Sequence, residues 1–125
     1  DGEQTRAFSY IDDVAPVIAR SVLLPEAYNQ VFNVGGDTMY TVNQLAQAVC
    51  RAMGVDAEIR HVAARNEVKH AYADHEKVKN TFDLPDPIPL DTGLARMSAW
   101  AQRAGSRKTK EFGEIEIRKG LPEGW

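Results

Sequence analysis

The clearest pattern of apolar positions in this chain lies between residues 41 and 54. Apolar residues recur there at helical spacing, as Leu45, Ala48, Val49 and Ala52. Thr41 and Gln44 stand three positions apart ahead of them, which is the spacing of a capping box, and Gly54 follows the last apolar position. The pattern predicts a helix that begins after Thr41 and ends at Gly54.

Three further helices are expected from the same spacing. Asp12 and Asp13 offer an N-cap for the first, Asp74 for the second and Asp91 for the third, because a carboxylate at a helix start accepts bonds from free amides. The apolar positions that define the three helices are, in order, Val14, Val17, Ile18 and Val22; Val78 and Phe82; and Leu94, Met97 and Ala101.

Short runs of β-branched and aromatic residues predict strands over Phe8 to Ile11, Gln30 to Val34 and Ala57 to Val62. Gly35 and Gly36 follow the second run and predict a turn with positive φ or a close approach of two backbones. Strands and helices are therefore interleaved but short. The fold class expected is a small mixed α/β lobe rather than a complete doubly wound sheet.

Residues 106–125 differ in character from the rest of the chain. Charged residues dominate, and Ile115 and Ile117 alternate with Glu114 and Glu116 as in an edge strand. We expect this segment to need a partner surface. The predicted organisation is thus a lobe over residues 1–105 and a charged C-terminal tail over residues 106–125.

Composition excludes several classes of function. The 125 residues carry a formal net charge of −3, whereas nucleic-acid-binding domains usually have a basic excess, so no nucleic-acid partner is expected. No apolar run approaches the length of a membrane span, so no membrane partner is expected either. The single cysteine, Cys50, cannot form an internal disulfide, which favours a reduced, cytoplasmic protein.

Two arginines offer the most informative candidate chemistry. Arg6 and Arg65 lie in distant segments, and a guanidinium presents a rigid fork of donors that suits phosphate oxygens at every working pH. A metal site is the competing interpretation, because His70, Asp74 and His75 lie close together. Their spacing is poor for a metal, and solvated or capping roles are favoured.

Several blocks of sequence occur in a fixed order: Arg6 to Val14, Val31 to Gly36, Tyr40 to Leu45, Arg65 to Asp74 with Lys77, Leu90 to Leu94, and Trp100. This ordered series resembles the C-terminal part of an extended short-chain dehydrogenase/reductase. The family is that of the NAD-dependent nucleotide-sugar epimerases and dehydratases, typified by UDP-glucose 4-epimerase. The resemblance covers about residues 2 to 102, and it implies the small substrate-binding lobe of such an enzyme without the NAD-binding Rossmann lobe.

The resemblance also implies roles for particular residues. Arg6 and Arg65 would contact the diphosphate of a UDP-sugar or related nucleotide sugar. Glu67, or Asn66 beside it, would contact the nucleotide ribose. Asn33 would line the same cleft, or the block around it serves only as a structural turn; both alternatives stay open.

Two parts of the family's machinery do not occur in this sequence. Family members bind NAD through a glycine-rich turn and transfer protons with a Tyr-x-x-x-Lys pair. The residues four positions beyond the tyrosines are Val14, Phe32, Gln44 and Glu76. NAD is therefore expected as the cofactor of the intact parent enzyme, an isomerase or dehydratase, and no cofactor is expected for this chain alone.

The chain begins at Asp1 without a methionine, and we interpret it as a fragment that is inactive by itself. Its expected function is that of the UDP-sugar-binding lobe of an NAD-dependent sugar epimerase or dehydratase, catalytically incomplete as this chain. The alternative, from a different class, is a non-catalytic interaction module that self-associates as a homodimer.

Overall fold

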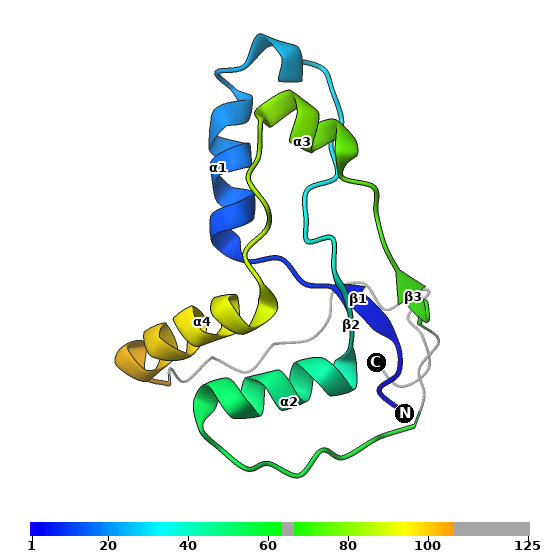
Figure 1. Ribbon diagram of the computed structural model, residues 1–125, viewed down its shortest axis with the longest axis vertical. Helices are drawn as coiled ribbons and strands as arrows, with labels where there is room; N and C mark the ends of the chain where they lie inside the picture. The colour runs from blue at the N-terminus through cyan, green and yellow to red at the C-terminus, as the bar shows by residue number, and fades with distance from the viewer. Residues whose placement is uncertain (64–66, 107–125) are drawn as a thin grey trace, which may run out of the picture.

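The computed structural model describes residues 1–63 and 67–106, and three short strands in it form a mixed sheet on one side of the molecule, near the N-terminus (Figure 1). The strand order is β2-β1-β3. The middle strand β1 (Thr5–Ala7) pairs antiparallel with β2 (Met39–Thr41) and parallel with β3 (His70–Ala71). Arg6 is the central residue of β1, opposite Tyr40 on one side and Ala71 on the other.

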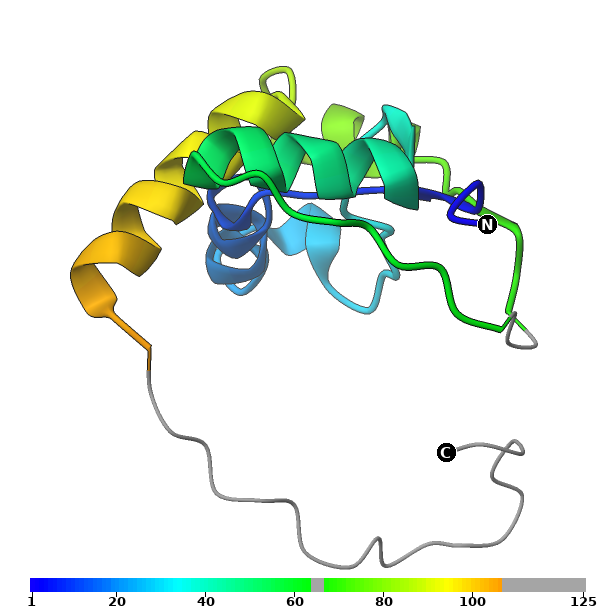
Figure 2. The same cartoon turned by 90° about the horizontal axis from the view of Figure 1, so that it is seen from below.

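Four helices are interleaved with these strands along the chain: α1 (Ile11–Ser21), α2 (Val42–Met53), α3 (Glu76–Phe82) and α4 (Leu90–Ala104), with a short 3₁₀ turn, η1 (Pro25–Ala27). Figure 1 shows α1 and α3 together at one end of the molecule and α2 and α4 at the other, and Figure 2 shows α4 running on past the end of α2. The small mixed α/β class expected from the sequence is therefore confirmed. Among the described residues no helix is both long and apolar enough to cross a bilayer.

The main core lies between α1 and α3. Val17, Val78 and Phe82 are buried there, and the ring of Phe82 meets that of Phe32 edge-on, with centroids 5.4 Å apart. Val78 and Phe82, one helical turn apart, are the most deeply buried large side chains in the described residues. Their inward orientation follows the sequence prediction for this short helix.

The helix predicted between Thr41 and Gly54 is confirmed with its caps. The Oγ1 atom of Thr41 accepts a bond from the Gln44 amide at 3.0 Å, and the Gln44 side chain accepts one from the Thr41 amide at 2.7 Å. Gly54 ends the helix in the left-handed conformation, with φ of 67°. Ala48 is the buried contact of this helix, and Ser98 of α4 donates to the carbonyl of Ala52 at 2.8 Å.

The strands expected over residues 8–11, 30–34 and 57–62 are wrong. The first strand forms earlier, at Thr5–Ala7, and Ile11 already begins α1. The carbonyl of Val31 accepts a bond from the Lys77 ammonium at 2.9 Å instead of a strand partner. Residues 57–62 are exposed and have no strand partner in the part of the chain that the structure describes.

The predicted aspartate caps were only partly right. Asp74 accepts a bond from the Glu76 amide at 2.8 Å, at the start of α3. By contrast, α1 and α4 begin after Tyr10 and Pro89 without side-chain caps, and Asp12, Asp13 and Asp91 lie within the first turns. Asp13 instead accepts a bond from the Ile88 amide at 3.1 Å, which ties α1 to the segment before α4.

The sequence pattern groups Met97 with Leu94 and Ala101 on one apolar face of α4. In the structure Met97 is 54% exposed, whereas Gly93 and Ser98 are the buried residues of that helix. Gly93 fits because a Cβ atom there would lie 3.1 Å from the ring of Tyr10. The edge strand predicted around Ile115 and Ile117 lies outside the described residues.

Candidate functional site

Arg6 lies on the middle strand β1, and backbone groups hold its guanidinium beside β3. Its Nη1 atom donates to the carbonyl of Thr5 at 2.7 Å and to that of Lys69 at 3.3 Å. The same Lys69 carbonyl accepts the Thr5 amide at 2.9 Å, so the guanidinium lies where β1 and β3 meet. Its side chain is 30% exposed, which leaves part of the donor fork open to solvent.

Glu67 lies beside this guanidinium. The Nη2 atom of Arg6 is 3.8 Å from the Oε2 atom of Glu67, and the Glu67 side chain is 52% exposed. That separation is an ion pair but exceeds the length of a hydrogen bond, so it does not use the Nη2 donors. The fold therefore brings together two of the residues singled out in the sequence. Arg65, together with Asn66, lies outside the described residues.

The neighbouring side chain on β3 is also ordered by the sheet. The Nδ1 atom of His70 lies 2.9 Å from the Oγ1 atom of Thr5, as a hydrogen-bonded pair across the parallel strands. Arg6, Lys69 and His70 thus come from the two paired strands and the residue just before β3. Of these groups, Arg6 supplies a guanidinium, which suits an anionic ligand, beside the carboxylate of Glu67.

Asn33 lies in a different environment. Its side-chain amide donates to the carbonyl of Asp74 at 3.4 Å, just ahead of α3. Its position is thus fixed by the segment that enters α3 rather than by the Arg6 pair. The alternative interpretation of this block as a structural turn fits the contact that the structure describes.

A second polar cluster was not found by sequence reasoning. The Nδ1 atom of His75 lies 2.9 Å from one carboxylate oxygen of Asp37, and the Lys79 ammonium binds the other oxygen. His75 is only 7% exposed. The bond from Lys79, and secondly that from His75, hold the pKa of Asp37 below its ordinary value, and the bond to Asp37 raises the pKa of Lys79. No local signal marks this cluster, because Asp37 and α3 are distant in sequence.

The paired glycines serve packing. A Cβ atom on Gly36 would lie 2.6 Å from the Phe8 carbonyl, and one on Gly35 would lie 3.2 Å from both His75 and Ser9. The close backbone approach predicted for this pair is therefore confirmed. Since protein atoms fill the space in front of both glycines, they do not form a cradle for the diphosphate of NAD.

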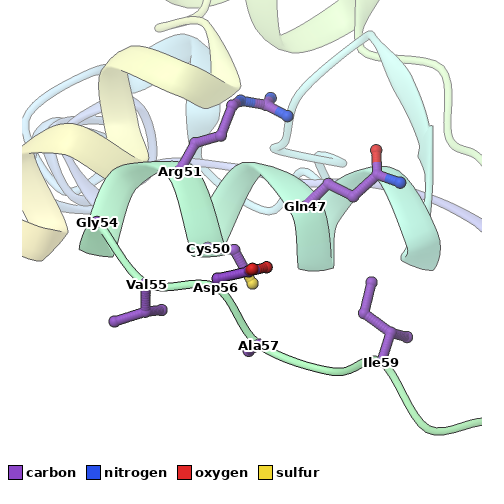
Figure 3. A pocket seen from close by; sticks show the side chains of 8 residues that line it. All are labelled: Gln47, Cys50, Arg51, Gly54, Val55, Asp56, Ala57 and Ile59. Carbon is purple, nitrogen blue, oxygen red and sulfur yellow. The ribbon is translucent and has the colours of Figure 1, made fainter.

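Cys50 faces an open groove between α2 and the loop that follows it (Figure 3). Arg51 points to the other side of the helix, where it pairs with Asp91 of α4 at 3.3 Å. No group of three or more metal-binding side chains occurs within residues 1–63 and 67–106. His70 and His75, considered above as metal ligands, instead pair with Thr5 and Asp37.

Known proteins resemble this chain over most of its length. A UDP-glucuronate 4-epimerase from Thermodesulfobacterium geofontis is 31% identical over 103 residues, which cover 82% of this chain and 32% of the relative. The chain thus spans about a third of the length of the curated relatives it matches. No family model matches the sequence.

Solved structures give the same result. The UDP-glucose 4-epimerase of Thermotoga maritima, determined with UDP-glucose, is 28% identical with a TM-score of 0.68, over 83% of this chain and 33% of that one. A variant of the Bacillus cereus UDP-glucuronic acid 4-epimerase, determined with UDP-4-deoxy-4-fluoro-glucuronic acid and NAD, has the same fold over 84% of this chain and 34% of its own, at 22% identity and a TM-score of 0.73. As the order of motifs predicted, the chain is related to the C-terminal part of nucleotide-sugar epimerases and dehydratases of the extended short-chain dehydrogenase/reductase type.

Proposed function

We propose that this chain is the nucleotide-sugar-binding lobe of an NAD-dependent sugar epimerase or dehydratase. The observation that carries the proposal is the position of Arg6, whose guanidinium donates to two backbone carbonyls while its Nη2 atom makes no hydrogen bond to residues 1–63 or 67–106. A guanidinium held in this way is preorganised for a diphosphate, because little conformational freedom is left to lose on binding.

In this proposal Arg6 and Arg65 contact the diphosphate, and Glu67 accepts hydrogen bonds from the ribose hydroxyls. The 3.8 Å between Arg6 and Glu67 allows both to contact neighbouring groups of one nucleotide. Asn33 is a weaker candidate for the same cleft, because its amide donates to the Asp74 carbonyl ahead of α3. The lobe of residues 1–105 would bind and orient the substrate, a role that affects rate without proton transfer by the lobe itself.

The proposal includes catalytic inactivity of this chain by itself. No Tyr-x-x-x-Lys pair occurs in the sequence. Its only adjacent glycines, Gly35 and Gly36, pack against other protein atoms. Hydride and proton transfer would then belong to the rest of a parent protein. The rest of the parent protein would also determine the specificity for the sugar carried by the nucleotide.

The test is isothermal titration of the purified chain with UDP. Arg65→Ala should weaken binding roughly 10- to 100-fold, because removing a hydrogen bond to a charged group costs about 1.5–3 kcal/mol. Arg6→Lys keeps the charge but loses the fork and should also weaken binding. Arg51→Ala is the matched control, since Arg51 pairs with Asp91 away from the site. Unchanged dissociation constants for both site variants would contradict the proposal.

A second candidate function has an observation of its own. Ile11 and Ile18 of α1 and Val22, which follows the helix directly, are 63%, 64% and 70% exposed and are spaced to share one helical stripe. An exposed apolar stripe of this kind favours association with another chain. We propose, as the alternative, a non-catalytic module that forms homodimers through this stripe. Light scattering with and without a UDP-sugar separates the two functions, because it measures the mass of the chain in solution. A dimeric mass that does not change with the ligand, and that falls to the monomer mass in Ile18→Glu, would support the module.

A further inference from the structure

The strand β3 is paired with the sheet over a very short length. It has two residues, His70 and Ala71, and it lies at one end of the strand order β2-β1-β3. Thr5 aligns with His70, and Arg6 aligns with Ala71. So short a strand at the edge of a sheet gains little stability from its backbone ladder alone. A side-chain bond across the pair can therefore contribute a large share of what fixes the position of β3.

The side chains of Thr5 and His70 make such a bond. Aligned residues of paired strands point to the same face of a sheet, and here the Oγ1 atom of Thr5 lies 2.9 Å from the Nδ1 atom of His70. A hydroxyl both donates and accepts, so the bond can form whether the ring is neutral or protonated. The pair is exposed to solvent. Its loss should thus change the position of β3 more than the stability of the whole fold.

Lys69, directly before His70, connects this bond to the candidate site. The Lys69 carbonyl accepts the Thr5 amide at 2.9 Å and the Nη1 atom of Arg6 at 3.3 Å. The same Nη1 atom also donates to the Thr5 carbonyl at 2.7 Å. The two carbonyls that hold the guanidinium therefore belong to Thr5 itself and to the neighbour of His70. A shift of β3 along β1 would move one carbonyl relative to the other.

We propose that His70 is a positioning residue for the nucleotide site. Its bond to Thr5 holds β3 against β1, and this keeps the Lys69 carbonyl in the place from which it orients the Arg6 guanidinium. The inference rests on the proposed function, because the ligand is the diphosphate that is assigned there to Arg6. His70 acts without touching the ligand, by reducing the conformational freedom that Arg6 loses on binding.

Hydrogen exchange in the ligand-free full chain, followed by NMR, tests the first step. In His70→Leu the Thr5 amide, which donates to Lys69, should exchange about 2- to 10-fold faster, because one hydrogen bond contributes modestly to local stability. Thr5→Val should have the same effect. His70→Asn places a polar amide near the position of Nδ1 and should restore the protection. The Val42 amide, which donates to the Gln4 carbonyl at 3.1 Å on the β2 side, is the internal control and should not change.

Titration of the full chain with UDP tests the second step. The dissociation constant should rise about 3- to 10-fold in His70→Leu and in Thr5→Val, because Arg6 is then less well oriented. It should return toward the parent value in His70→Asn and in Thr5→Ser, which keep a partner for the bond. Thr38→Val, at an exposed threonine just ahead of β2, is the matched control and should leave the constant unchanged.

The outcomes separate this inference from the proposed function. Faster exchange of the Thr5 amide with unchanged UDP affinity would overturn the positioning of Arg6 by His70. Unchanged exchange of that amide in His70→Leu would overturn the role of the bond itself. A parent chain that binds no UDP would overturn the proposed function and, with it, the nucleotide as the ligand, and the exchange rates measured without ligand would still show separately whether His70 holds β3.

Discussion

The guanidinium of Arg6 and the carboxylate of Glu67 lie 3.8 Å apart, although they come from distant parts of the chain. The parallel pairing of β1 with β3 makes them neighbours, since Thr5 and Arg6 align with His70 and Ala71. One donor group and one acceptor group are thereby placed side by side where β1 and β3 pair.

This pairing leads to a prediction about two ligands that share a diphosphate. Glu67→Gln should weaken binding of UDP, because the amide replaces a charged acceptor for the ribose hydroxyls. It should strengthen binding of inorganic pyrophosphate, because a negative charge beside Arg6 is removed. Titration of both ligands into the variant and the parent chain checks the prediction. Parallel changes for UDP and pyrophosphate would show that Glu67 does not contact the ribose.

Gly36 should not tolerate a side chain. Because a Cβ atom would lie 2.6 Å from the Phe8 carbonyl, Gly36→Ala should lower the free energy of unfolding by about 1–3 kcal/mol. The backbone around Gly36 or Phe8 must move, because the added Cβ atom would meet a backbone oxygen and not a flexible side chain. Urea denaturation measures the loss. Gly54→Ala is the comparison, because it meets no atom within 4 Å and strains only the backbone; a Gly36→Ala chain as stable as the parent would contradict the close approach.

The capping box of α2 should contribute measurably to stability. Thr41→Ala removes the acceptor of the Gln44 amide and should cost about 1 kcal/mol in the free energy of unfolding. Thr41→Ser keeps the hydroxyl and should recover most of that loss. Thr92→Ala, an exposed position inside α4, serves as the control. Equal stability of the alanine and serine variants at position 41 would exclude the cap as the cause.

The Asp37 cluster should make stability depend on acidic pH. The pKa of Asp37 is lowered in the folded chain, first by Lys79 and then by His75. Ionised Asp37 therefore stabilises the fold above its ordinary pKa of about 4, and this contribution is lost as the pH falls through the lower pKa of the folded state.

Asp37→Asn should accordingly destabilise the chain near neutral pH, and the difference from the parent chain should shrink in acid. Chemical denaturation across this pH range measures it. Asp56→Asn, which removes an exposed carboxylate in the loop after α2, is the control. A difference between the Asp37 variant and the parent that stays constant with pH would show that the contribution of Asp37 does not come from its charge.

The elements that could be predicted from the sequence were those marked by local signals. The helix from Val42 to Met53 depends on a capping box and a glycine within a few residues of one another, and it was predicted with both ends. The strands were not, because they are only two or three residues long and their partners come from distant segments. Val31 illustrates why the strand prediction was wrong. It is a β-branched residue in an apolar run, yet it is 83% exposed and its carbonyl accepts a bond from Lys77.

The candidate site shows the same division. The chemistry of Arg6 could be predicted from its sequence block, but its contact with Glu67 depends on the pairing of two strands. The cluster of Asp37, His75 and Lys79 depends on how α3 packs against the loop after Gly36, and no spacing in the sequence indicates it.

The central claim is that this chain binds a nucleoside diphosphate through its arginines. Isothermal titration with UDP and with uridine, each at low and high salt, tests it most directly. Attraction between guanidinium and phosphate groups at an exposed edge is screened by salt, so UDP affinity should fall as salt rises. Uridine should bind more weakly and with little dependence on salt. Equal affinity for the two ligands, unaffected by salt, would contradict a diphosphate site in this lobe.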